Sequence, residues 1–256
     1  MQKPGIFAWF SYPLPIEERF RLIREAGIEA VSLWWGDEDR HAQPDMAGKL
    51  GLEIDNFHAP FYGSNKLWQE SEEGDALFAQ ICTCTEDCAR HGIGTAVIHA
   101  AWDAPLVTEY GLRRFDRLVD LAEKLGVNLA FENCGTVDHL EAILSRYDSP
   151  RVGFCYDSGH EHCNHPDVHC LSRWGDRLMA VHLDDNCGDG DSHLLPFDGT
   201  CDWDAVRAGL RQARPIPYLT LEVDFNPQHE ASRIYKPLSA EAFLARAADA
   251  AKRLQK

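Results

Sequence analysis

Six residues with metal-binding side chains each stand at the end of a short apolar segment of the sequence. They are, in chain order, His58, His99, Glu132, Asp157, His182 and Glu222. Imidazole nitrogens and carboxylate oxygens are common protein ligands of divalent metals. If the segment ends lie together, the carboxylates cannot all stay ionised without a cation among them. Six separate structural roles would instead require a separate partner for each buried polar group. The pattern therefore predicts a divalent-metal site.

Three further residues extend this set. His160 follows the aspartate of the set by three positions, so its side chain can turn back over the same site. Asp191 and His193 form an Asp-x-His pair inside the segment 184–202, which is rich in Gly and Asp and lacks helical or strand periodicity. Non-periodic segments of this length are usually functional. The further candidate ligands for the metal or the substrate are therefore His58, His99, His160, Asp191 and His193.

The segments that must position these residues alternate in type along the chain. Eight short runs of apolar and β-branched residues are bounded by Gly, Pro, Asp or Asn, which is typical of buried parallel strands. The predicted strands are Gly5–Phe10, Glu29–Trp34, Leu52–His58, Thr95–His99, Asn128–Glu132, Val152–Tyr156, Leu178–Leu183 and Tyr218–Val223. Amphipathic stretches between them predict helices, including Pro15–Gly27, Leu106–Gly126 and a closing helix over Phe243–Leu254. Four glycines predict helix-to-strand joints: Gly27, Gly51, Gly92 and Gly126.

Eight β/α units without a break in composition predict an α/β fold, a closed (β/α)₈ or TIM barrel that forms a single domain over residues 1–256. An open doubly wound sheet is disfavoured because no glycine-rich fingerprint follows any predicted strand. In a barrel the carboxyl ends of all strands meet on one face, which is where barrel enzymes carry their chemistry. The six strand-end residues are thus expected on that face.

Composition limits the classes of partner. The 256 residues include 41 Asp and Glu against 25 Lys and Arg, a net charge of −16, which disfavours a nucleic-acid partner. No apolar run approaches the roughly 20 residues of a membrane span, and no signal-peptide pattern is present. The nine cysteines show no paired spacing, which predicts buried thiols in a reducing, cytoplasmic setting. A homodimer is expected from the general frequency of such assemblies.

Four motifs, taken in order, carry a family resemblance. They are Glu132 at a strand end, the run Gly153–His160, the run Val181–Asp185 and Leu221-Glu-Val223. Together they resemble the xylose isomerase-like barrel superfamily, which includes sugar isomerases, ketose epimerases, sugar phosphate isomerase/epimerase-type proteins and the endonuclease IV family. The resemblance extends from about Gly5 to the end of the chain. It is specific for the superfamily and much less specific within it.

The resemblance to the sugar enzymes implies a carbohydrate-metabolism isomerase or epimerase that acts on a small sugar or sugar phosphate. One divalent metal, Mn²⁺, Mg²⁺ or Co²⁺, would stabilise an enediolate during proton transfer. The implied metal ligands are Glu132, Asp157, His182 and Glu222. Glu132 and Glu222 would also serve as the catalytic acid and base, and His160 would orient an oxygen of the substrate. Phe7, Trp34 and Trp102 are expected to form apolar walls for the sugar.

The resemblance to endonuclease IV implies a different class, a phosphodiesterase that cleaves DNA at abasic sites with up to three Zn²⁺ ions. The implied ligands are His58, His99, Glu132, Asp157, His160, His182, Asp191, His193 and Glu222. The segment 184–202 contains no Lys or Arg, and the net charge of −16 opposes contact with phosphates. The sugar enzyme is therefore favoured. The sugar, its phosphorylation and the choice among isomerisation, epimerisation and dehydration remain open.

Overall fold

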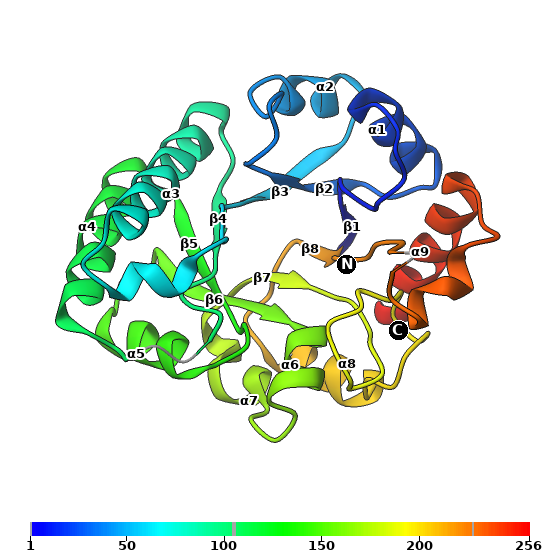
Figure 1. Cartoon of the computed structure of the whole chain (residues 1–256). Helices are drawn as coiled ribbons and strands as arrows, with labels where there is room; N and C mark the ends of the chain where they lie inside the picture. The colour runs from blue at the N-terminus through cyan, green and yellow to red at the C-terminus, as the bar shows by residue number, and fades with distance from the viewer. Residues whose placement is uncertain (1, 104–105, 227) are drawn as a thin grey trace.

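The computed structural model describes residues 2–103, 106–226 and 228–256, and shows a ring of parallel strands enclosed by helices (Figure 1). The strands are β1 (Lys3–Phe7), β2 (Ala30–Trp34), β3 (Glu53–His58), β4 (Thr95–Ile98), β5 (Asn128–Glu132), β6 (Val152–Asp157), β7 (Leu178–His182) and β8 (Tyr218–Leu221). They form one eight-stranded sheet in the order β7-β6-β5-β4-β3-β2-β1-β8. The predicted (β/α)₈ barrel is confirmed.

Helices connect the strands and cover the outside of the sheet (Figure 1). The α-helices are α1 (Ile16–Glu25), α2 (Gln43–Lys49), α3 (Glu72–His91), α4 (Glu109–Leu125), α5 (Asp138–Arg146), α6 (Ser158–Asn164), α7 (Cys170–Trp174), α8 (Trp203–Gln212) and α9 (Ala240–Leu254). Short 3₁₀ helices are η1 (Ser64–Trp68), η2 (Gly175–Arg177) and η3 (Ala231–Tyr235). Among the described residues, no helix is long and apolar enough to cross a membrane.

The pairing of strands that closes the barrel differs at the junction of β7 and β8. Seven neighbouring strand pairs form parallel ladders, whereas β7 and β8 meet beyond the end of β7 through an isolated bridge between Leu183 and Leu221. The Leu183 amide donates to the Thr220 carbonyl at 2.9 Å, and the Glu222 amide donates to the Leu183 carbonyl at 3.2 Å. We call this junction the seam. It lies directly beside two of the predicted site residues.

Helix ends follow from local chemistry. Thr108 caps α4 by accepting a hydrogen bond from the Gly111 amide, and Gly126 ends it in the left-handed conformation. The predicted helix Leu106–Gly126 therefore starts later than expected, because the capping threonine fixes its first turn. All four predicted joint glycines adopt positive φ: Gly27, Gly51, Gly92 and Gly126. These joints are confirmed.

The first strand differs from its prediction. Gly5–Phe10 was expected, but β1 covers Lys3–Phe7 and pairs with β8 from Lys3 onward. After Phe7 the chain leaves the sheet, and Ser11 takes a φ of 65°. Apolar character alone extended the prediction too far, because Phe10 is buried under helix α9 against Phe243 rather than in a strand.

Two stacked layers of side chains occupy the barrel interior. The mouth layer, at the carboxyl ends of the strands, contains Phe7, Trp34, His58, His99, Glu132, Asp157, His182 and Glu222. The floor layer, two residues earlier on each strand, contains Gly5, Ser32, Asn56, Val97, Ala130, Cys155, Ala180 and Thr220. Alternate strand residues point to the same face, so both layers face inward. Four floor residues share one buried apolar cluster, namely Val97, Ala130, Cys155 and Ala180.

Two β-bulges each add one residue to the interior. The register between β2 and β3 shifts after Val31, which leaves Asp55 as the extra residue of β3. Asp55 accepts a hydrogen bond from the Thr220 hydroxyl at 2.6 Å. The register between β6 and β7 shifts after Phe154, which leaves Met179 as the extra residue beside the apolar floor cluster.

The nine cysteines are free thiols. Five are buried, three are partly buried and Cys187 is exposed. Buried thiols behave as small apolar side chains. The expectation of buried cysteines therefore holds for most of them, and Cys187 is the exception because it lies in the segment 184–202.

Candidate metal-binding and catalytic site

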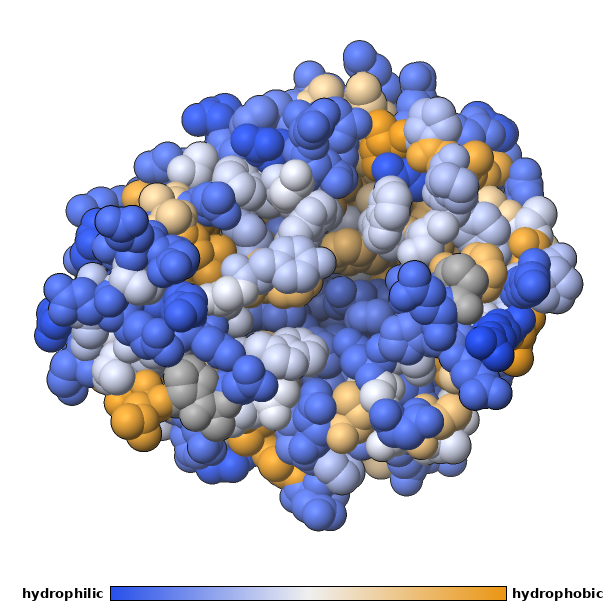
Figure 2. Space-filling model, viewed as in Figure 1, coloured by the Kyte–Doolittle hydropathy of each residue, from blue (hydrophilic) through white to orange (hydrophobic). Residues whose placement is uncertain are grey.

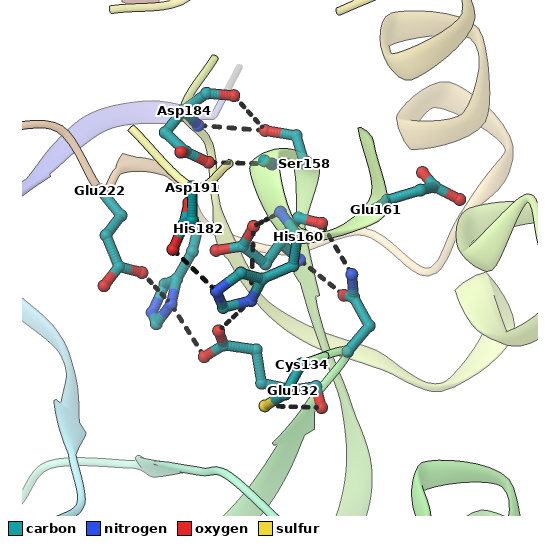
Figure 3. Close-up of polar contacts among 12 residues, drawn as sticks. Glu132, Cys134, Ser158, His160, Glu161, His182, Asp184, Asp191 and Glu222 are labelled. Carbon is teal, nitrogen blue, oxygen red and sulfur yellow. Dashed lines mark hydrogen bonds and ion pairs between the residues drawn. The ribbon is translucent and has the colours of Figure 1, made fainter. Parts of the chain in front are cut away.

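The structure brings the six predicted strand-end residues together at the mouth of the barrel. His58, Glu132, Asp157 and His182 are the last residues of β3, β5, β6 and β7. His99 and Glu222 come directly after β4 and β8. In Figure 3 the side chains of Glu132, His160, His182 and Glu222 point toward one another, whereas Glu161 points away. The barrel thus places residues from six strands at a single site.

Glu132 lies at the centre of the site and is almost fully buried. Its Oε1 is 3.0 Å from His160 Nδ1 and 3.3 Å from His99 Nε2. Its Oε2 is 3.1 Å from His182 Nδ1 and 3.6 Å from His58 Nε2. Four imidazoles from four parts of the chain thus surround one carboxylate.

The carboxylates of Glu132 and Glu222 meet at one imidazole. His182 Nδ1 is 2.5 Å from Glu222 Oε2 and 3.1 Å from Glu132 Oε2. Glu222 is the more accessible of the two, with 19% of its side chain exposed against 1% for Glu132. One glutamate is therefore part of the buried base of the site, and the other reaches the open side.

Asp157 is held rigidly. The Asn133 side chain donates to the Asp157 carbonyl and accepts from the Asp157 amide, both at 2.8 Å. Asp157 Oδ1 also caps helix α6 by accepting from the His160 amide at 2.6 Å. The first turn of α6 therefore places His160 above Glu132. The other carboxylate oxygen, Asp157 Oδ2, is buried without a hydrogen bond from the described residues.

A second group of residues continues the site into the segment 184–202. Asp191 Oδ2 is 3.2 Å from His160 Nε2 and 3.3 Å from His193 Nε2. His193 Nδ1 lies 3.4 Å from Asp184 Oδ2 and 3.1 Å from the Glu222 carbonyl oxygen. Asp184 is fully buried, and its Oδ1 accepts from the Gly159 amide at 2.9 Å. All three predicted additions to the cluster, His160, Asp191 and His193, therefore lie within it.

The carboxyl groups of the site have pKa values shifted in opposite directions. Burial raises the pKa of a carboxyl group, but His99, His182 and His160 outweigh it at Glu132 and hold its pKa well below the usual range. At Glu222 the effect of burial is likewise outweighed by His182, and its pKa falls to about 2. Burial raises the pKa of Asp157 well above its ordinary value, despite the attraction of His160. The pKa of Asp191 is likewise lowered, despite its burial, by His193 and His160, so negative charge concentrates on Glu132, Glu222 and Asp191.

The donor set fits a divalent cation. The ligand atoms of Glu132, Asp157, His182 and Glu222 lie within 4.8 Å of one another. Buried atoms of all four have no hydrogen bond from the described residues, including both Glu132 oxygens and Glu222 Oε2. Buried polar atoms without partners are costly unless an unseen ligand satisfies them. The described part of the chain holds three further groups of the same kind, and one of them combines Asp184, Asp191 and His193.

A cavity of about 380 Å³ opens beside the cluster. It is lined by Phe7, Trp9, Trp34, Asp37, His58, Phe61, Tyr62, His193, Glu222, Val223 and Asp224. Figure 2 shows the hollow at the centre of this face, with hydrophilic residues at its base. Of the three predicted aromatic walls, Phe7 and Trp34 line this cavity. Trp102 lies elsewhere, because its ring packs on His160 at 5.2 Å and on His99 at 6.1 Å.

Comparison with known proteins matches residues 20–241 to the family described as xylose isomerase-like TIM barrel. The chain belongs to this family. The superfamily resemblance drawn from the sequence motifs is thereby confirmed, over most of the chain.

Several known proteins are similar to this chain. Fructoselysine 3-epimerase of Shigella flexneri is 25% identical over 225 residues, which cover 77% of this chain and 81% of the relative. The uncharacterized protein y4fM of Sinorhizobium fredii is 55% identical, but over only 69 residues, or 27% of this chain and 22% of that protein. The fold of D-psicose 3-epimerase from Clostridium cellulolyticum H10 superposes with a TM-score of 0.79 at 11% identity, covering 99% of this chain and 98% of that one.

Sequence reasoning missed several residues of this family member's site. They are Trp9, Asp37, Phe61, Tyr62, Cys134, Asp184 and Asp224. Four of them, Trp9, Cys134, Asp184 and Asp224, follow a mouth-layer residue by two positions. Alternate residues of a strand point to the same side, and this alternation continues past the strand end. It could therefore have predicted these four residues. Asp37, Phe61 and Tyr62 follow β2 and β3 at longer distances, where no periodic rule applies.

Proposed function

We propose that this protein is a divalent-metal-dependent sugar isomerase or epimerase that transfers a proton at the carbon beside the carbonyl of a ketose. The observation that carries the proposal is the meeting of Glu132 and Glu222 at His182, within a site that opens into a cavity. Two carboxylates at one site are the groups that proton removal and return require. The epimerase names of the relatives support the same class of reaction.

The proposed metal ligands are Glu132, Asp157, His182 and Glu222, because their ligand atoms lie close together and buried atoms of all four have no hydrogen bond from the described residues. Three carboxylates and one imidazole suit Mn²⁺, Mg²⁺ or Co²⁺. When bound, one such ion supplies Lewis-acid stabilisation of negative charge on the substrate oxygens.

The protein's own residues carry the proton. One of Glu132 and Glu222, as the carboxylate, removes it from the carbon beside the carbonyl. The carboxylic acid so formed returns it for isomerisation, and for epimerisation the other glutamate delivers to the opposite face a proton that it has taken from solvent. His160 bridges Glu132 and Asp191 at 3.0 and 3.2 Å, so both of its ring nitrogens face carboxylates, and its proposed role is to orient the Glu132 carboxylate beside the substrate. Phe7 and Trp34 provide apolar surface against the sugar.

Solvent exchange tests this reaction. The protein is incubated with a divalent metal in D₂O and with a panel of ketoses and their phosphate esters. Deuterium should enter the carbon beside the carbonyl of the true substrate, because a carboxylic acid that has taken the substrate proton exchanges with solvent. Partial labelling also supports the proposal, since a closed site slows exchange. Absence of labelling in every ketose, with metal bound, contradicts it.

A second candidate is an abasic-site phosphodiesterase with up to three Zn²⁺ ions. The observation that favours it is the joining of all nine residues of that pattern into one network. Against it, the described residues that line the cavity include neither Lys nor Arg. Metal analysis separates the two: one Mn or Co per chain supports the sugar enzyme, and three Zn supports the nuclease. EDTA-sensitive cleavage of a duplex with one abasic site would overturn the first assignment.

A further inference from the structure

The cavity beside the candidate site has an aromatic wall. Trp9, Trp34, Phe61 and Tyr62 all line it, and the side chains of Trp9 and Tyr62 remain 48% and 80% exposed. The Phe61 and Tyr62 rings lie 4.5 Å apart, and the Phe61 and Trp34 rings 5.3 Å apart. Exposed aromatic faces around a cavity attract both the apolar face of a sugar and a cation.

Two carboxylates lie in the same cavity outside the proposed metal ligands. Asp37 Oδ2 accepts a hydrogen bond from the Gln43 side chain at 2.8 Å, and Asp224 Oδ2 accepts from the Ser11 hydroxyl at 3.0 Å. Asp224 Oδ1 is buried and has no hydrogen bond from the described residues. Both carboxylates thus accept side-chain hydrogen bonds from neutral donors, and His193 also lies beside Asp224.

The basic side chains among the described residues that line the cavity are those of His58 and His193. The described residues that line it include neither Lys nor Arg. Arg19 lies behind the wall, stacked on the Trp9 ring at 4.7 Å, and donates to the carbonyls of Leu14 and Ala8. Two of its nitrogens, Nε and Nη1, are therefore already engaged with the backbone. A phosphate in this cavity would meet two carboxylates, and no Lys or Arg among the described lining residues would offset their charge.

We infer that the substrate carries a protonated amine, which this cavity holds between Asp224, Asp37 and the aromatic wall, and that it carries no phosphate. This inference rests on the proposed function, since it concerns the part of a ketose beyond its reacting carbons. An ammonium group is attracted by the carboxylates of Asp37 and Asp224 and gains cation–π attraction from the rings. The same carboxylates repel a phosphate ester.

Matched ligands test this charge preference. The series consists of D-fructose and its derivatives in which an amine or a phosphate replaces the hydroxyl at C1 or at C6. Binding to the metal-loaded protein is measured by calorimetry, and deuterium exchange is measured on the same samples. One amine should bind about tenfold tighter than fructose, and both phosphates should bind more weakly than fructose. A phosphate that binds tighter than fructose, or equal binding of amines and fructose, overturns the inference.

The two readouts separate the inference from the proposed function. Exchange without preference for an amine refutes the inference and leaves the epimerase or isomerase assignment intact. Preference for an amine without exchange refutes the assignment and leaves the charge preference intact. Absence of both binding and exchange refutes both.

Single substitutions test which side chains cause the preference for an amine. Asp224→Asn should lower the ratio of amine to fructose affinity about tenfold, because it removes the charge that faces the amine. Tyr62→Leu, at a highly exposed position where folding is not at risk, should lower it about two- to fivefold. The matched control is Asp120→Asn, which removes the same charge from the exposed surface of α4. An unchanged ratio in both Asp224→Asn and Tyr62→Leu would refute the inference.

Discussion

The mouth layer and the floor layer of the barrel come from the same eight strands, yet their chemistry differs sharply. Beside the apolar cluster, the polar floor residues are satisfied: Ser32 donates to Asn56 at 2.6 Å, and Thr220 donates to Asp55 at 2.6 Å. In the mouth layer, buried atoms of His99, Glu132, Asp157, His182 and Glu222 have no hydrogen bond from the described residues. A shift of two residues along a strand thus separates a packed core from a site.

This contrast shows that the mouth layer lowers the free energy of unfolding in order to bind a ligand, whereas the floor layer does not. Unsatisfied buried polar atoms each cost about 1–3 kcal/mol, so a cluster of them persists only where a ligand compensates. The floor layer supplies packing and closed hydrogen bonds that hold the strand ends in place. Changes in the mouth layer should therefore affect activity, whereas changes in the floor layer should affect stability.

The largest expected effect belongs to the mouth layer. Glu222→Gln should lower turnover of the true ketose by about 10²–10⁴-fold with the fold intact, because it removes both a proton-exchanging group and a charge at the proposed metal. Turnover and circular dichroism are measured on the same preparation. The control is Glu17→Gln on the exposed face of α1, which should keep full turnover. More than about a tenth of the activity remaining in Glu222→Gln would exclude Glu222 as an acid or base.

Metal removal should act on the same layer. Dialysis against EDTA should abolish exchange and lower the unfolding midpoint, because the crowded carboxylates lose their counter-ion. A metal present at a hundredfold excess over its Kd contributes about 2.7 kcal/mol to the free energy of unfolding. Differential scanning calorimetry with and without added Mn²⁺ measures this change. An unfolding midpoint insensitive to both EDTA and Mn²⁺ would show that the mouth layer binds no divalent ion.

A smaller effect is expected from the bulge residue Asp55, next to the floor layer. Burial raises its pKa from 3.8 to about 6, against the hydrogen bonds from Thr220 and Asn56 and the charge of His182. The folded state therefore holds this proton more tightly than the unfolded state. The contribution of Asp55 to stability is then greatest below about pH 4, and at most about 3 kcal/mol is lost as pH rises to about 6.

Asp55→Asn tests this sign directly, because asparagine does not titrate in this range. Denaturant unfolding at pH 4 and pH 7 should show that the variant gains stability relative to the wild type at the higher pH. A difference between the two proteins that does not change with pH would show that Asp55 ionises normally inside the barrel.

The smallest effect concerns a closed hydrogen bond of the floor layer. Ser32→Ala leaves the buried Asn56 Oδ1 without its donor, which should cost about 1–2 kcal/mol of unfolding free energy. Urea denaturation measures it. Thr83→Ala, an exposed threonine on α3, serves as the control and should change stability by less than about 0.5 kcal/mol. Equal stability changes in Ser32→Ala and Thr83→Ala would refute the description of the floor as a satisfied layer.

The barrel and most of the cluster could be predicted because both depend on repeated local patterns. Every β/α unit ends its apolar run with a polar or aromatic residue, so His58, Glu132 and His182 were recognisable from position alone. Closure of the barrel then brings them together without further information. The same logic placed His160, since a helix starting at Asp157 returns its third residue over the site.

Residues beyond these patterns could not be predicted. Asp37 and Tyr62 reach the cavity through loops, whose paths depend on packing rather than on periodicity. Trp102 follows its strand closely, yet it packs on His160 instead of lining the cavity with Trp34. The bulge that brings Asp55 inward is invisible in the apolar pattern, because a register shift is a property of two strands together.

The seam between β7 and β8 couples ligand binding to the closure of the barrel. His182 and Glu222, whose side chains approach to 2.5 Å, stand on its two sides, where the backbone ladder is reduced to a single bridge. A ligand bound by both side chains therefore links β7 and β8 at the place where the backbone joins them by a single bridge. The amides of Leu183 and Glu222 donate the hydrogen bonds that close the seam. Their protection from hydrogen exchange should therefore rise when a ligand binds and fall when it leaves.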